Sequence, residues 1–228
     1  MATSDLYSRM CDLYDATLFS FGRGNVVIDE PHVDKKTLTK HVTVELDQDR
    51  IDIPESTLSD NNKAYCNNST PNLREVCDRV IITEKNEQLY IVLVELKSQF
   101  KSFCKGAAQL YSSGIKITAR LMPLTDFLPE KYKFVAIVAC QKPTVEEIDL
   151  IQGLIDTKGK LEAKDDLKYK AFYNDLVRNI DITIDQYQHN KLPLKTEYQI
   201  GNVPFVIYTL PSNNDTGSFK LDDVLSII

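Results

Sequence analysis

The stretch LYIVLVELKSQF, residues 89–100, decides how we read the fold. It begins with six uncharged residues and then places Glu95 and Lys97 near its end. A short apolar run of this kind is typical of a strand that is buried on both faces and is therefore central in a covered sheet. Because residues i and i+2 of a strand share a face, we expect Glu95 and Lys97 to project together from the polar end of a rigid element.

The segment before this strand adds a third polar side chain. CDRVIIT, residues 77–83, and the strand at 89–97 flank the polar segment EKNEQ, which predicts a β-hairpin with its turn near Asn86. Counting back from that turn sets Asp78 opposite residues 94–96. We therefore expect the carboxylate of Asp78 to lie beside that of Glu95.

Two adjacent carboxylates repel each other, and a cation between them removes the repulsion. Hard oxygen ligands with open positions suit Mg²⁺ or Mn²⁺. Such an ion can polarise a phosphodiester and lower the pKa of a bound water, while Lys97 orients the water or stabilises charge on the phosphate. The alternative interpretation of Asp78, Glu95 and Lys97 is a salt bridge that caps the edge of a sheet.

These residues resemble a known signature. Asp78, a hydrophobic strand and Glu95-Leu96-Lys97, with sixteen residues between the two acids, are similar to the D…(D/E)-x-K pattern of the PD-(D/E)XK nuclease superfamily. That superfamily includes restriction endonucleases, Holliday junction resolvases and RecB-like exonuclease domains. The resemblance implies that Asp78 and Glu95 bind the metal and that Lys97 is the catalytic lysine. It also implies that Gln109 lies at the catalytic site.

The same resemblance implies an αβββαβ core over residues 5–142. Four residues after Gln109, where the RecB-like branch carries tyrosine, this chain has Ser113. A short E-x-K pattern also occurs at Glu162-Ala163-Lys164, in a polar context that we interpret as helical, where residues i and i+2 do not share a face.

The patterns place the chain in the α/β (α+β) class, with a central mixed sheet flanked by helices. The resemblance implies that this sheet is restriction endonuclease-like. We expect a single domain over residues 1–228, in which residues 143–228 form a C-terminal elaboration of helices plus a strand pair. The expected elements are an amphipathic first helix capped by Ser4 with Leu6, Met10, Leu13 and Thr17 on one stripe, a β-hairpin in 41–53, an irregular connection in 54–72, a helix in 100–121, a strand in 131–140, helices in 144–155 and 165–180, strand material in 198–210 and a helix in 218–228 opened by Ser218.

The formal net charge of −6 argues against a protein that coats nucleic acid through bulk electrostatics. Residues 97–142, however, hold eight basic residues against two acidic ones. Lys101, Lys105 and Gln109 recur every four residues there, which favours a phosphate-facing, DNA-binding stripe on a helix. The alternative is an ordinary solvated polar face.

Other classes of site find little support in the sequence. The five cysteines are widely spaced without C-x-x-C, and the three histidines lack ligand spacing, so neither a disulfide framework nor a zinc site is indicated. No Gly-rich phosphate loop or nucleophile elbow is present. The apolar runs are too short for a bilayer and the first residues do not form a signal peptide, so we expect a cytoplasmic protein with no membrane partner.

The function expected from these patterns is a Mg²⁺-dependent deoxyribonuclease that acts in restriction, phage defence or repair. The alternative is a non-catalytic binding or assembly subunit that retains the nuclease fold. A homodimer or a partner protein subunit stays open, as does the source of a further acidic ligand, for which Asp12, Asp15 and Glu45 are candidates.

Overall fold

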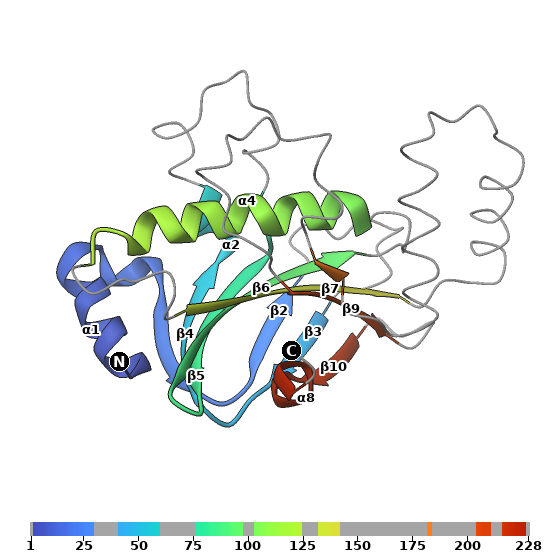
Figure 1. Ribbon diagram of the computed structural model, residues 1–228, viewed down its shortest axis with the longest axis horizontal. Coiled ribbons are helices and arrows are strands. Elements are labelled where there is room, and N and C mark those ends of the chain that lie inside the picture. The colour runs from blue at the N-terminus through green and yellow to red at the C-terminus, as the bar shows by residue number, and fades with distance from the viewer. Residues whose placement is uncertain are drawn as a thin grey trace, which may run out of the picture.

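The fold consists of two β-sheets packed face to face, with the long helix α4 on the outer side of the larger sheet (Figure 1). The computed structural model describes residues 2–29, 41–59, 76–97, 103–124, 132–141, 182–183, 204–210 and 216–226. Within these residues the architecture is α+β, with mixed sheets, as the sequence predicted.

The larger sheet has seven strands in the order β1-β4-β5-β6-β7-β9-β8 among the described residues. In that order the strands are Ser20–Arg23, Asp49–Pro54, Arg79–Lys85, Gln88–Lys97, Tyr132–Gln141, Pro204–Leu210 and Ile182–Thr183. Strands β1, β4, β5 and β6 pair antiparallel, whereas β7 is parallel to both β6 and β9. The smaller sheet has the order β10-β3-β2, formed by Thr216–Lys220, His41–Glu45 and Val26–Asp29.

Helices cover the larger sheet on the side away from the smaller one (Figure 1). Helix α4 (Phe103–Leu121) packs across β6 and β7, and α1 (Thr3–Leu13) packs on β4 and β5. The short helix α2 (Glu55–Ser59) contacts β4 and α4, the 3-10 turn η1 spans Ala16–Leu18, and α8 (Leu221–Ser226) follows β10. None of these helices, the only ones in the described part of the chain, is long and apolar enough to cross a membrane.

Strand β6 separates two hydrophobic cores, which confirms its predicted central position. Ile91 and Leu93 point into the core beneath α1 and α4, whereas Val92 and Val94 point into the core between the two sheets. All four side chains are fully buried. Each such side chain stabilises the fold by about 1.5–3 kcal/mol, so this one strand supports both layers.

The β5–β6 hairpin confirms the predicted turn. Its two loop residues, Asn86 and Glu87, have φ values of 52° and 63°. Positive φ at both central residues matches the right-handed twist of the strands that such a turn joins. The register then runs from Lys85 opposite Gln88 to Arg79 opposite Val94.

The predicted hairpin in 41–53 is wrong in its pairing. Strands β3 and β4 both form, but β3 pairs with β2 and β10, and β4 pairs with β1 and β5. The chain changes layer after Leu46, whose side chain is buried between the sheets and whose N–H donates to Asn25 Oδ1 over 3.3 Å. Alternation of polar and apolar residues identifies a strand without identifying its partner.

The first helix lacks the predicted Ser4 cap, because the helix already begins at Thr3 and its N-cap residue is Ala2. Of the predicted stripe, Leu6 and Met10 are buried. Leu13 is 51% exposed, and Thr17 lies in η1, because the helix ends at Leu13 and the chain turns away.

Ser218 does not open the last helix either. It lies within β10, which pairs in parallel with β3 and buries Phe219, so the helix begins only at Leu221. The connection predicted to be irregular in 54–72 contains α2, and its residues 60–72 lie outside the described residues. The predicted helices in 144–155 and 165–180 also lie outside them, whereas the helix in 100–121, the strand in 131–140 and part of the strand material in 198–210 are confirmed as α4, β7 and β9.

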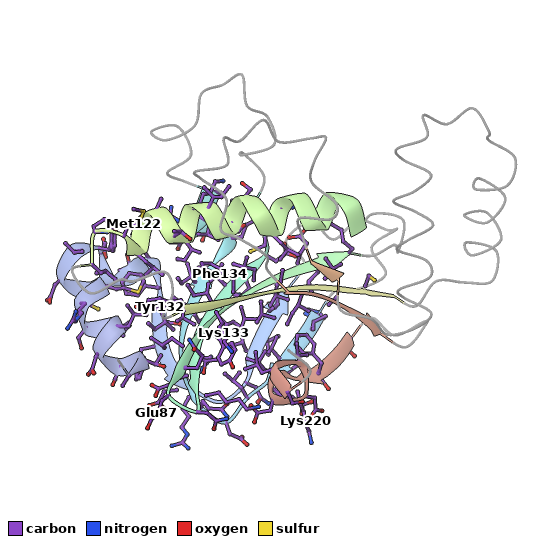
Figure 2. The ribbon with its side chains drawn as sticks, in the orientation of Figure 1. Glu87, Met122, Tyr132, Lys133, Phe134 and Lys220 are labelled. Carbon is purple, nitrogen blue, oxygen red and sulfur yellow. The ribbon has the colours of Figure 1, made fainter. Side chains whose placement is uncertain are left out.

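We expect Glu87→Gly to raise the free energy of unfolding by about 0.5–1 kcal/mol, because a left-handed conformation is strained for any residue with a side chain. Glu87 lies at the outer tip of the hairpin (Figure 2), so the substitution removes no buried contact. Urea denaturation measures the effect. Gln88→Gly, one residue later inside β6, is the control and should destabilise; equal destabilisation by both variants would contradict the turn conformation.

Candidate active site

The side chains of Glu95 and Lys97 lie on the face of the larger sheet that α4 covers. They continue the alternation of Ile91 and Leu93, which point into the core beneath that helix. The prediction that Glu95 and Lys97 share a face is therefore confirmed. Both lie near the C-terminal end of β6, where Glu95 still belongs to the buried run 91–96 and Lys97 is half-buried.

Asp78 reaches the same end of the hairpin from the neighbouring strand. Since Arg79 is opposite Val94 in the antiparallel register, the next step brings Asp78 beside Glu95, as the turn count predicted. The Asp78 carboxylate accepts a hydrogen bond from the Leu96 N–H at 2.6 Å. A carboxylate that accepts a backbone N–H is held in a defined orientation at the strand end.

The backbone around Asp78 is also fixed. Its carbonyl accepts a hydrogen bond from the N–H of Glu55, the first residue of α2, at 3.2 Å. Arg79, the next residue, turns to the opposite face, where its Nε lies 3.6 Å from Asp52 Oδ1. Burial raises the pKa of Asp52, although the charges of Arg79 and Arg50 oppose that shift. The Asp-Arg sequence therefore divides its charges between the two faces of the sheet.

Lys97 Nζ donates to Glu95 Oε1 in an ion pair that is almost closed to solvent. The side chain of Glu95 is 1% exposed and that of Lys97 is 14% exposed. A carboxylate at this depth needs a charged partner, because its desolvation costs several kcal/mol. Lys97 supplies that partner.

Gly106 of α4 lies directly over this ion pair. A Cβ atom at Gly106 would be 3.2 Å from Val138 Cγ2 and 3.4 Å from both Glu95 Cγ and Lys97 Cε. These distances leave little room for any side chain, so the glycine allows the helix to approach the sheet closely. The backbone of α4 at Gly106 therefore covers Glu95 and Lys97.

Cys77 lies between these acids and α4 and keeps its proton. Burial is the largest cause that raises the pKa of its thiol far above the usual range, and the charges of Glu95 and Asp78 raise it further. The hydrogen bond with Ser113 acts in the opposite direction and is outweighed. A protonated, fully buried thiol is a weak nucleophile.

Gln109 faces the segment that leads into Asp78. Its Nε2 donates to the carbonyl of Val76 at 3.1 Å, which places the amide beside the hairpin entry. One turn further along α4, Ser113 Oγ accepts from the Cys77 N–H at 2.7 Å and donates to the Gln109 carbonyl at 2.8 Å. Sequence reasoning missed this contact of Ser113, although its spacing of four residues from Gln109 signals a shared helix face.

The candidates for a further acidic ligand do not join the pair. Asp12 and Asp15 are exposed, and Asp15 Oδ1 accepts from the N–H of Thr17, which lowers the pKa of Asp15. Glu45 lies on β3 of the smaller sheet, across the second core from the α4 face. Throughout the described ranges, no group of three or more His, Cys, Asp or Glu side chains gathers where it could hold a metal ion.

The lysine stripe is only partly within the described residues. Lys105 belongs to α4, one turn before Gln109, while Lys101 lies outside the described residues. Cys11, Cys77 and Cys140 are free thiols.

Asp78 and Glu95 are chemically suited to a hard divalent cation, since they place two carboxylates on neighbouring strand ends. Lys97 now holds one Glu95 oxygen, so an ion would share that carboxylate with the ammonium. No protein-family model matches this chain, and no curated protein or solved structure matches it significantly.

We expect Lys97→Met to lower the free energy of unfolding by roughly 3 kcal/mol, because it leaves the buried Glu95 charge without its ammonium. The double variant Lys97→Met/Glu95→Gln should recover much of that loss. Urea denaturation without divalent cations measures both variants. Lys220→Met, at an exposed position of β10, is the matched control and should change stability by less than about 0.5 kcal/mol. A double variant less stable than Lys97→Met would contradict the buried ion pair.

Proposed function

We propose that this protein is a metal-dependent nuclease that hydrolyses phosphodiester bonds of DNA, with a role in restriction, phage defence or repair. The observation that carries the proposal is the convergence of Asp78, Glu95 and Lys97 at one end of the β5–β6 hairpin. Two carboxylates and an ammonium on rigid strands provide the charges that phosphoryl transfer requires.

Each of the three side chains has a distinct task. Asp78 and Glu95 would hold Mg²⁺ or Mn²⁺, which supplies a polarised phosphodiester and an acidified water when bound. Lys97 would direct its ammonium to the phosphate and stabilise the negative charge that develops on its oxygens. The hydrogen bond from the Leu96 N–H would keep the Asp78 carboxylate oriented toward that metal ion.

The order of elements supports the proposal. Along the chain, α1, β4, β5, β6, α4 and β7 occur in this order, with β4, β5 and β6 antiparallel and β7 parallel to β6. The elements η1, β1, β2 and β3 lie between α1 and β4, and α2 lies between β4 and β5. This succession agrees with the αβββαβ core that the resemblance to PD-(D/E)XK nucleases implies. The additional strands β2, β3 and β10 form a separate layer behind it.

The burial of Glu95 favours a second candidate function. A carboxylate that is 1% exposed and ion-paired with Lys97 also suits a non-catalytic binding or assembly subunit, in which the pair is a structural salt bridge. DNA binding by Lys101 and Lys105 is a separate property from DNA cleavage at the Asp78, Glu95 and Lys97 site. Experiments can therefore distinguish the nuclease from the non-catalytic subunit. The homodimer or partner protein subunit, the cytoplasmic location and the division at residue 142 stay predictions.

We expect the purified protein to cleave DNA in Mg²⁺ or Mn²⁺ and to be inactive in EDTA. Asp78→Asn and Glu95→Gln should each lower turnover at least about 100-fold, because each removes a carboxylate from the ion. Gel assays with plasmid, linear and single-stranded DNA measure cleavage and separate endonuclease from exonuclease activity.

Glu87→Gln, at the far end of the same hairpin, is the matched control and should retain full activity (Figure 2). Calorimetric titration with Mn²⁺ should show a site in the unmodified protein that Asp78→Asn abolishes. Folded protein that binds DNA yet cleaves none of the substrates in either metal would support the non-catalytic subunit instead.

We expect Lys101→Ala/Lys105→Ala to weaken DNA binding and to reduce the slope of log affinity against log salt by up to about two units. Phosphate contacts position a duplex without reading its bases, so sequence preference should change little. Binding measured across a salt series in Ca²⁺, which prevents cleavage, gives the slope.

Lys133→Ala/Lys220→Ala changes the net charge equally and is the control. Lys133 stacks over the Tyr90 ring on the side of the sheet away from α4, and Lys220 belongs to the smaller sheet (Figure 2). An equal change of slope in both double variants would mean that Lys101 and Lys105 belong to an ordinary solvated face and not to a DNA-binding stripe.

A further inference from the structure

Two side chains of α4 form hydrogen bonds with the backbone immediately before Asp78. Gln109 Nε2 donates to the Val76 carbonyl at 3.1 Å, and Ser113 Oγ accepts from the Cys77 N–H at 2.7 Å. Gln109 and Ser113 are four residues apart, so they project from the same face of the helix. They bind two consecutive residues of the segment, and their amide and hydroxyl groups leave that segment little freedom to slide along the helix.

The Ser113 contact is buried, and the Gln109 contact is partly buried. Ser113 is fully buried, as is Cys77, and Val76 is nearly so. The Ser113 hydroxyl is itself oriented, because it donates to the Gln109 carbonyl at 2.8 Å while it accepts from Cys77. Buried hydrogen bonds of this kind are costly to leave unmade, so they define one position of the segment.

The two hydrogen bonds of Gln109 and Ser113 bear on the position of Asp78. Asp78 precedes the first residue of β5 and so lies just before the ladder that pairs Arg79 with Val94. Two further hydrogen bonds hold Asp78 itself: its carbonyl accepts from the Glu55 N–H, and its carboxylate accepts from the Leu96 N–H. On the N-terminal side of Asp78, among the described residues, Gln109 and Ser113 hold the backbone of Val76 and Cys77.

We propose that Gln109 and Ser113 are positioning residues that fix the Asp78 carboxylate beside Glu95, and that Gln109 acts through the backbone of Val76 without meeting the substrate. The inference rests on the proposed function for its catalytic consequence. Its structural part, the dependence of Asp78 on α4, is independent of any activity. A shift of about 1 Å in a metal-binding carboxylate suffices to impair catalysis. The hydrogen bonds of Gln109 and Ser113, although outside the site, therefore control its geometry.

The test compares Ser113→Ala and Gln109→Met with Thr118→Ala. Thr118 Oγ1 donates to the Gly114 carbonyl at 2.8 Å, the same bond that Ser113 makes to Gln109. In the described part of the chain, Thr118 makes no hydrogen bond to residues 76–78. Thr118→Ala thus reproduces the loss of a helix side-chain bond without loosening the segment. Amide hydrogen exchange of Leu96, followed by NMR in the metal-free protein, reports whether Asp78 still accepts its N–H.

We expect Leu96 exchange to accelerate about fivefold to tenfold in Ser113→Ala and in Gln109→Met, and to be unchanged in Thr118→Ala. In Mg²⁺, kcat should fall by a similar factor with the KM for DNA unchanged, since positioning affects the transition state more than binding. If one variant fails to fold, the other decides the outcome. Unchanged Leu96 exchange in a folded variant overturns the inference, whereas faster exchange together with an unmodified protein that cleaves no DNA supports the positioning and refutes only the nuclease.

Discussion

The antiparallel register between β5 and β6 is the constraint on which the candidate site depends. A two-residue turn with positive φ at both positions sets that register, and every later pair follows from it up to Arg79 and Val94. A shift by one residue would turn Glu95 and Lys97 to the opposite face, into the apolar core between the sheets. The burial of both faces of β6 makes such a shift prohibitively costly, so the polar end of the hairpin is held where it is.

The Glu95–Lys97 pair shows how stability and reactivity meet at this end. A carboxylate this deeply buried is stabilised by its ammonium partner, and the pair in turn requires backbone alone above it, which Gly106 provides. Burial, reinforced by the charges of Glu95 and Asp78, raises the pKa of the Cys77 thiol far above its usual range.

The central hairpin and the residues at its end could be predicted from sequence because both depend on local signals. An apolar run, a polar turn and the alternation of a strand place Asp78, Glu95 and Lys97 together without knowledge of the rest of the chain. Partners far apart in sequence were beyond such signals: the alternation in 41–53 predicted strands but not that they enter different sheets, and Ser218 resembled a helix cap although its neighbours pair with β3. Ser113 was missed for the same reason, since its role arises from a contact with Cys77 across 36 residues.

The division of β3 and β4 between two sheets has a consequence for the order in which the chain can mature during synthesis. The core between the sheets needs Phe219, Leu221, Val224 and Leu225, which the ribosome delivers long after β6. Until then one face of β6, with Val92, Val94 and Leu96, has lost water contact only in part and offers an apolar surface to other chains. The candidate site, whose side chains lie on the opposite face, can therefore be assembled while the molecule is still prone to aggregate, and a chain shortened by its last two dozen residues should depend on chaperones even with every proposed active-site residue present.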